Sequence, residues 1–113
     1  MGLNKRKQVL ASAPNVVHSF DAAMLAQTAL RCHDEHGLTH FAFIHDSYGT
    51  HAADTSVMSR ILREVAVEMY RPDRLQEFHD YVQSYAPDVP LPAVPGRGNF
   101  DVEEVLKAPY FFA

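Results

Sequence analysis

The residues in this chain best placed to do chemistry are His45 and Asp46, which follow a short apolar run at residues 41–44. The run is partly aromatic and is closed by small residues, which is typical of a buried strand that ends in a tight turn. Packing cannot explain a carboxylate at such a strand end, because an unpaired buried charge costs several kcal/mol. Asp46 therefore needs a metal ion, a cation or water. A metal-binding carboxylate and a solvated turn aspartate both satisfy this requirement.

Two other combinations of residues have types that occur in functional sites. His33 and His36 are three residues apart at a predicted helix end, a spacing that metal ligands use, but the chain has only one cysteine and offers a weak match to a structural zinc site. Ser47 with His45 and Asp46 contains the residue types of a nucleophilic relay. Adjacent residues of a strand point to opposite faces, so these three cannot form that relay.

The composition limits the size and the partners of the protein. A chain of 113 residues makes one small domain or a piece of a larger one, and 47% hydrophobic residues are enough for a core. The net charge of −4 argues against an autonomous nucleic-acid binder, which usually carries a basic face. The single cysteine, Cys32, excludes an internal disulfide and fits a reducing cytoplasm. No stretch approaches the ~20 apolar residues of a membrane helix, so no membrane partner is expected.

The elements that must position Asp46 are two helices on either side of the strand. The first is predicted to follow a break at Pro14, with Ser19 or Asp21 as its cap and His18 just ahead, and to run to about residue 36 with Gly37 at C′. Its apolar stripe recurs every three or four residues: Met24, Leu25, Thr28, Ala29 and Cys32. The second helix is predicted to have Asp54 or Thr55 as its cap. Its stronger stripe is Val57, Met58, Ile61, Leu62, Val65 and Met69.

The rest of the chain is predicted to add one helix and an extended connector. Pro72 is expected inside the first turn of the third helix, whose apolar stripe is predicted to be core: Leu75, Phe78, Val82 and Tyr85. Residues 86–98 are rich in proline and glycine and read as a stiff connector. Residues 101–106 can form one or two helical turns, and the aromatic end of the chain is expected to dock in a pocket.

These elements predict an α+β fold that is mostly helical, with a short strand or hairpin around residues 41–46. Three parts are expected along the chain: a basic segment at 1–13, a central segment at 14–85, and the connector with the aromatic tail at 86–113. The strand is expected to leave an unsatisfied sheet edge. An exposed apolar face is also expected, either on the strand or on the second helix.

Five segments along the chain resemble one protein family. His45-Asp46-Ser47-Tyr48-Gly49-Thr50 resembles the H-D-S-[FY]-G-T motif in the palm of single-subunit, bacteriophage-type DNA-directed RNA polymerases, which include phage and mitochondrial enzymes. Upstream, residues 5–8 and 13–21 are similar to the segment that precedes this motif in the family. Downstream, residues 91–100 and the aromatic, alanine-ended terminus at 110–113 are similar to its closing stretch. The resemblance covers about residue 5 to residue 113.

The resemblance implies a role for each matching residue. Asp46 would be one of two palm aspartates that hold the catalytic magnesium ions, and His45 would act beside it in catalysis. His18 would lie against the minor groove of the nucleic acid near the growing end. The terminal residues Phe111, Phe112 and Ala113 would support the active site from below. Two Mg²⁺ ions about 3.5–4 Å apart would stabilise the attacking 3′ oxygen and the leaving pyrophosphate.

The resemblance also implies that this chain needs other parts. The second metal-binding aspartate and the nucleotide-holding lysine and tyrosine lie in earlier family motifs that this chain lacks. We therefore expect the carboxyl-terminal part of a polymerase that is inactive alone. Its expected partners are the remaining polymerase, a DNA template, the RNA product and nucleoside triphosphates, in the cytoplasm of a phage-infected bacterial cell. The alternatives are a non-catalytic remnant or interaction module, and a small metal-binding protein that uses Asp46 and histidines.

Overall fold

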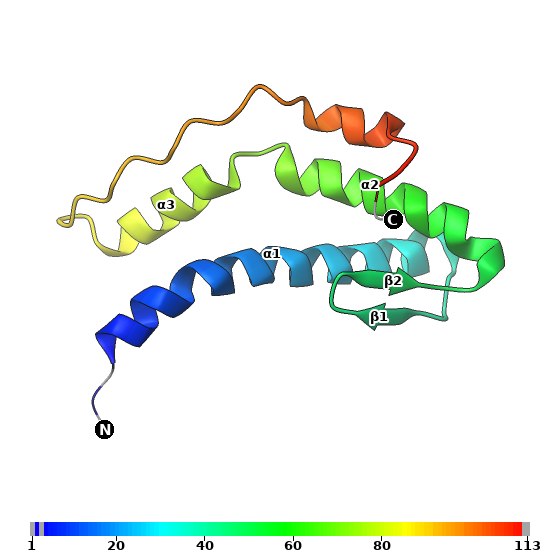
Figure 1. The fold of residues 1–113 in the computed structure, drawn as a ribbon, viewed down its shortest axis with the longest axis horizontal. Coiled ribbons are helices and arrows are strands. Elements are labelled where there is room, and N and C mark those ends of the chain that lie inside the picture. The colour runs from blue at the N-terminus through cyan, green and yellow to red at the C-terminus, as the bar shows by residue number, and fades with distance from the viewer. Residues whose placement is uncertain (1, 3, 112–113) are drawn as a thin grey trace. The chain divides into compact units, whose positions relative to one another are not determined.

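The computed structural model describes residue 2 and residues 4–111, and it is mostly helical with a single small hairpin in that part of the chain (Figure 1). The order of elements is α1 (Lys5–His36), β1 (Ala42–Ile44), β2 (Ser47–Gly49), η1 (Ala52–Asp54), α2 (Thr55–Tyr70), α3 (Arg74–Tyr85) and η2 (Val102–Lys107), where η marks a 3₁₀ helix. The chain divides into two compact units, Met1–Val65 and Ala66–Ala113. Helices with one antiparallel hairpin are consistent with the α+β class that the sequence predicts.

The first helix, α1, is longer than predicted. It begins after Asn4, whose side-chain oxygen accepts a hydrogen bond from the Lys7 amide at 3.1 Å, and it ends at Gly37, where φ is 68°. The predicted break at Pro14 is wrong, because the helix continues through this proline. Proline removes one helical hydrogen bond. The carbonyl left without its helical donor is that of Leu10. Because Leu10 is 67% exposed, water can replace the missing donor.

The longer helix changes the setting of two residues but confirms the predicted stripe. His18 lies inside α1 and does not precede its cap. Ser19 does not cap the helix either, since its hydroxyl donates to the Val16 carbonyl at 2.6 Å within the helix. The buried residues of α1 are Met24, Thr28 and Cys32, all on the predicted apolar stripe. The carboxyl-terminal half of α1 therefore provides its packing face.

The hairpin formed by β1 and β2 is short and mostly exposed. Ala42 pairs with Gly49, residue 43 with residue 48, and Ile44 with Ser47. The prediction of a buried strand is wrong, because Ile44 is 69% exposed. The expected exposed apolar face is therefore found on the strand. A two-stranded hairpin is marginally stable by itself, so its side-chain contacts and its anchoring decide how well the turn is held.

Aromatic side chains cover one face of this hairpin. Phe41 stacks on Phe43 with ring centroids 5.3 Å apart, and Phe43 meets its cross-strand partner Tyr48 edge to face at 5.5 Å. Cross-strand aromatic pairs of this kind contribute about 0.2–1 kcal/mol each. The apolar run before the motif thus stabilises the hairpin from one side.

The second helix, α2, carries the predicted core stripe. Ile61 and Val65 are fully buried, with 0% exposure. The other strongly buried residues of α2 are Met58, Leu62, Ala66, Val67 and Met69. The helix follows η1 directly, and the Thr55 hydroxyl donates to the His51 carbonyl at 3.3 Å. Because this stripe is covered, α2 does not carry the exposed apolar face that was the other expectation.

In the second unit, α3 begins after Asp73, whose side chain accepts a hydrogen bond from the Gln76 amide at 3.0 Å. Pro72 precedes this cap, so its predicted place inside the first turn is wrong. The predicted core stripe is also wrong, since Leu75 is 51% exposed and Phe78 is 45% exposed. Together with Val82 and residues 91–95, these side chains line an open apolar groove.

The connector is extended, as predicted, and it is held to the residues that follow α2. Arg97 donates to the carbonyls of Tyr70 and Arg71 at 2.7 and 2.8 Å. Arg71 in turn forms an ion pair with Glu103 in η2, with 2.9 Å from Nε to Oε1. Through residue 2 and residues 4–111, no helix has both the length and the apolar character that a bilayer crossing requires.

Candidate functional site at the hairpin turn

The candidate site is the two-residue turn between β1 and β2, which consists of His45 and Asp46. Both residues lie in the turn, so the prediction that they continue the strand with opposite orientations is wrong. His45 has φ of 55°, and among the described residues it is the one non-glycine residue with positive φ. A two-residue hairpin turn requires such a conformation because its twist must match the strands. For a residue with a Cβ atom this conformation costs on the order of 1 kcal/mol.

Asp46 is exposed at this turn and is free to bind a ligand. Within the described part of the chain, no hydrogen bond or ion pair engages its carboxylate. Because Asp46 is exposed, water can solvate its charge. The carboxylate therefore does not need a metal ion to offset a cost of burial. The turn instead presents a carboxylate oxygen, available as a metal ligand, at the tip of the hairpin.

The structure brings together only part of the predicted site. His45 and Asp46 are neighbours in the turn, whereas His18 is an exposed residue of α1 that no described contact connects to them. Phe111 is half-buried and belongs to the second unit. Phe112 and Ala113, the other predicted supporting residues, lie outside the described residues.

A pair of histidines at the base of the hairpin was missed by the sequence reasoning. The imidazole rings of His40 and His51 are stacked, with centroids 4.5 Å apart and planes 23° apart. The Thr50 hydroxyl donates to the His40 carbonyl at 2.9 Å, and the Thr39 hydroxyl lies 3.0 Å from His40 Nδ1. The strand register could have indicated this pair. Continuing the pairs 42–49, 43–48 and 44–47 outward places residue 40 opposite residue 51.

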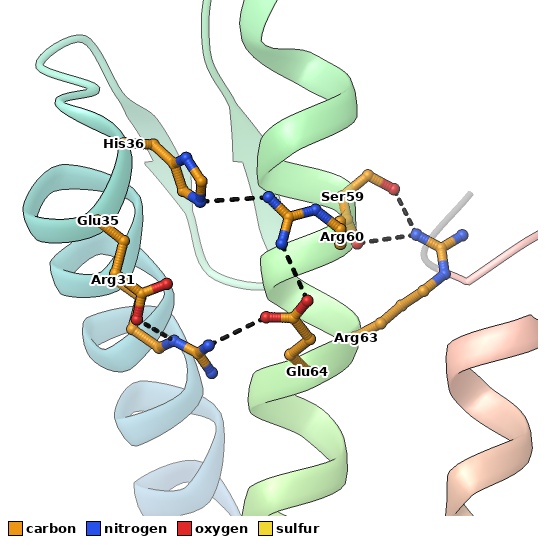
Figure 2. Close-up of polar contacts among 7 residues, drawn as sticks. All are labelled: Arg31, Glu35, His36, Ser59, Arg60, Arg63 and Glu64. Carbon is orange, nitrogen blue, oxygen red and sulfur yellow. Dashed lines mark hydrogen bonds and ion pairs between the residues drawn. The ribbon is translucent and has the colours of Figure 1, made fainter.

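A charged network joins the two helices of the first unit that flank the hairpin in sequence (Figure 2). Arg31 of α1 donates to Glu35 and to Glu64 of α2, each at 3.0 Å. Glu64 also accepts from Arg60 at 3.0 Å, and the other end of the Arg60 guanidinium lies 3.2 Å from Nε2 of His36. A guanidinium can only donate, so this ring nitrogen of His36 is an acceptor. The network therefore connects α1, which precedes the hairpin in sequence, to α2, which follows it.

The histidines of α1 do not assemble a zinc site. His33 Nδ1 lies 2.9 Å from Asp34, while His36 accepts from Arg60. Burial raises the pKa of the Cys32 thiol, which disfavours the thiolate that zinc requires. Across residue 2 and residues 4–111 there is no group of three or more histidine, cysteine, aspartate or glutamate residues that could hold a metal ion. The described residues therefore do not surround Asp46 with two or more further side chains of these types.

The family match and the similar proteins all point to one protein family. Residues 1–89 match the family described as DNA-dependent RNA polymerase. DNA-directed RNA polymerase 1A of Nicotiana tabacum is 46% identical over 107 residues, which cover 95% of this chain and 68% of the tobacco protein. DNA-directed RNA polymerase 1, mitochondrial, of Arabidopsis thaliana is 44% identical, and DNA-directed RNA polymerase 3, chloroplastic, of Nicotiana sylvestris is 47% identical, both over 95% of this chain.

The extent of these matches differs between the relatives. The chain spans only 11% of the length of the Arabidopsis mitochondrial protein and of the Nicotiana sylvestris chloroplastic protein. It nevertheless aligns with each of them over nearly its whole length, including the segment that forms the hairpin turn. The chain therefore belongs to the family of single-subunit, phage-type DNA-directed RNA polymerases.

Proposed function

We propose that this chain supplies the carboxyl-terminal part of the palm of a DNA-directed RNA polymerase and that Asp46 is a ligand of its magnesium site. The observation that carries the proposal is the state of Asp46. It is exposed at the tip of a two-residue turn, and no described residue engages its carboxylate. A carboxylate kept free at a defined backbone position is suited to binding an ion or a substrate-bound ion.

The donor chemistry of the turn fits magnesium. Mg²⁺ prefers oxygen ligands, keeps several waters, and is typically bound through one or two carboxylates together with substrate phosphates. Asp46 provides one such carboxylate, and the second belongs in this proposal to another part of the polymerase. When bound, the two ions supply charge stabilisation to the attacking 3′ oxygen and the leaving pyrophosphate. A single carboxylate cannot complete such a site, so the isolated chain is expected to be inactive.

The remaining predicted residues take supporting roles in this proposal. His45 adjoins Asp46 in the turn, where its φ is positive, and we assign it to orienting the site. The exposed imidazole of His18 can hydrogen-bond the minor-groove acceptors that all base pairs share. Phe111, with Phe112 and Ala113, is proposed to support the site from below.

The whole enzyme in this proposal has four kinds of partner: the remaining polymerase, a DNA template, the RNA product and nucleoside triphosphates. A net charge of −4 suits a part that relies on other regions to bind nucleic acid. The cytoplasm of a phage-infected cell is one proposed location. The mitochondrial and chloroplastic names of the relatives make an organelle the second candidate.

A non-catalytic interaction module is the second candidate function. It is favoured by the open apolar groove between α3 and residues 91–95, in which Phe78 is 45% exposed. Such a surface needs a covering partner whether or not the complex performs chemistry. The two functions differ in what Asp46 contributes, because a module would not depend on this carboxylate.

The test is transcription on a primed template by a mixture of the purified chain, the complementary amino-terminal polymerase fragment, nucleoside triphosphates and magnesium. We expect RNA synthesis only when both chains are present. Asp46→Asn should reduce it about a hundredfold or more, since metal-held charge is worth several kcal/mol. The matched control is Asp34→Asn, because this carboxylate is exposed on α1 and, among the described residues, its side chain contacts only His33. This substitution should leave synthesis unchanged. A stable complex that makes no RNA would reject the catalytic role and favour the module.

A further inference from the structure

We propose that His40 and His51 form an aromatic clasp that closes the base of the hairpin and positions Asp46, a role that rests on the proposed function. Neither residue touches the reacting groups in this proposal. Each acts through the turn that it holds. The stacked rings, 4.5 Å apart, are the observation that carries the inference.

The strand register shows why these two residues meet. The ladder pairs Ala42 with Gly49 at the open end of the hairpin. Two steps further outward, His40 falls opposite His51 on the same face, because side chains alternate along a strand. Both residues lie outside the hydrogen-bonded strands, yet their rings are in contact and the Thr50 hydroxyl bonds the His40 carbonyl at 2.9 Å. The side chains therefore extend the pairing beyond the last ladder pair.

His51 also connects the hairpin to the start of α2. Its carbonyl accepts from the Asp54 amide at 2.9 Å and from the Thr55 hydroxyl at 3.3 Å. α2 is the best-buried helix of the chain, and Ile61 within it is 0% exposed. The backbone of His51 thus connects its ring to the well-buried helix of the first unit. His40 brings the opposite strand to that anchor.

The geometry makes the base of the hairpin important for its tip. His40 and His45 are five residues apart in sequence, which corresponds to about 17 Å along an extended strand. A tilt of about 3° at the base then moves the tip by about 0.9 Å. Functional sites must be held within about 0.5 Å of their working geometry. Because two strands alone are marginal, a clasp that prevents such tilting would control how Asp46 is presented.

The first measurement is amide hydrogen exchange by NMR over residues 42–49 of the 113-residue chain. His51→Leu removes the ring but keeps an apolar side chain, and we expect exchange about two- to tenfold faster, as the loss of one aromatic pair implies. His51→Phe restores a ring and should remain within about twofold of the original chain. His40→Leu should match His51→Leu, and the double variant should be no faster than either. The control is His33→Ala, an exposed histidine that contacts Asp34.

The second measurement is the magnesium dependence of RNA synthesis in the mixture with the amino-terminal fragment. If the clasp sets the fraction of chains with a correctly placed turn, the apparent metal affinity falls by that fraction. His51→Leu should then raise the magnesium concentration for half-maximal rate up to about tenfold. The rate at saturating magnesium should change less than twofold, and His51→Phe should restore the original dependence. A purely structural loss of complex would instead lower the rate at every magnesium concentration.

The outcomes separate the clasp from the polymerase function. Faster exchange in His51→Leu, rescue by His51→Phe and a shifted magnesium dependence would support the proposal. Unchanged exchange in both leucine variants would overturn the clasp. Faster exchange with an unchanged magnesium dependence in an active mixture would overturn the positioning role. If the unmodified mixture makes no RNA, the proposed function and the positioning role both fail, while the exchange data still decide whether the clasp exists.

Discussion

Glu64 takes part in an ion pair between α1 and α2, and its replacement by alanine gives a specific prediction. Its carboxylate accepts one hydrogen bond from Arg31 of α1 and one from Arg60 of α2, both at 3.0 Å. Glu35 binds the same Arg31 at the same distance, but it lies on the same helix. Glu35→Ala is therefore a matched control that removes a carboxylate without removing the link between helices.

The magnitude follows from burial and from what remains after each substitution. The Glu64 side chain is 29% exposed, and a hydrogen bond to a charged group is worth about 1.5–3 kcal/mol before solvent screening is considered. In Glu64→Ala, Arg31 keeps Glu35 and Arg60 keeps His36, so neither cation is left without a partner. We therefore expect a loss of about 1.5 kcal/mol, below the cost of a broken buried pair. Glu35→Ala should cost about 0.4 kcal/mol, as for an exposed helical pair.

The assay is equilibrium urea unfolding followed by circular dichroism, at low salt and again at about 1 M salt, where the Debye length is about 3 Å. The difference between the two variants should be about 1 kcal/mol at low salt and should shrink at high salt. Equal losses for Glu64→Ala and Glu35→Ala would refute the reasoning, because the bond between helices would then contribute no more than the bond within one helix.

Two further predictions concern the buried face of α1. The fully buried hydroxyl of Thr28 has no hydrogen-bond partner among the described residues, so Thr28→Val should stabilise the chain by about 1 kcal/mol, and a lower unfolding midpoint would contradict this. Burial raises the pKa of the Cys32 thiol above its ordinary value of 9.0, so alkylation of the folded chain at pH 8 should be at least about tenfold slower than that of free cysteine. By the same linkage, the preference of the fold for the neutral thiol stabilises it fully below pH 9 and is lost as the pH rises further.

The buried stripes of the first two helices could be predicted because their information is local. Apolar residues that recur every three or four positions must share one helix face, and Cys32 and Ile61 are indeed fully buried. Whether a proline breaks a helix depends on the surroundings of the carbonyl that it leaves unpaired. Sequence reasoning had no access to the exposure of Leu10, so it placed a break at Pro14 and began the helix too late, after Ser19 or Asp21.

The third helix shows a different limit of the same reasoning. Periodicity reports that a helix has an apolar face, but it does not report what covers that face. The apolar stripe that includes Leu75 and Phe78 is present on the helix, but it lines an open groove instead of a core. In the candidate site, the position of Asp46 at the end of a strand, next to a turn, was predicted. The stacking of His40 on His51 was not, because it depends on the register of two strands that no single segment encodes.

The turn combines features that lower its own stability with a position suited to function. His45 occupies a backbone conformation that glycine would adopt without cost, beside a carboxylate that no described residue engages. The adjoining strand leaves Ile44 69% exposed, so packing adds little at the tip. Strained and weakly packed segments persist where the surrounding structure holds them. Here that support comes from the base of the hairpin, which argues that the placement of Asp46 is set by its connection to α2 rather than by the turn itself.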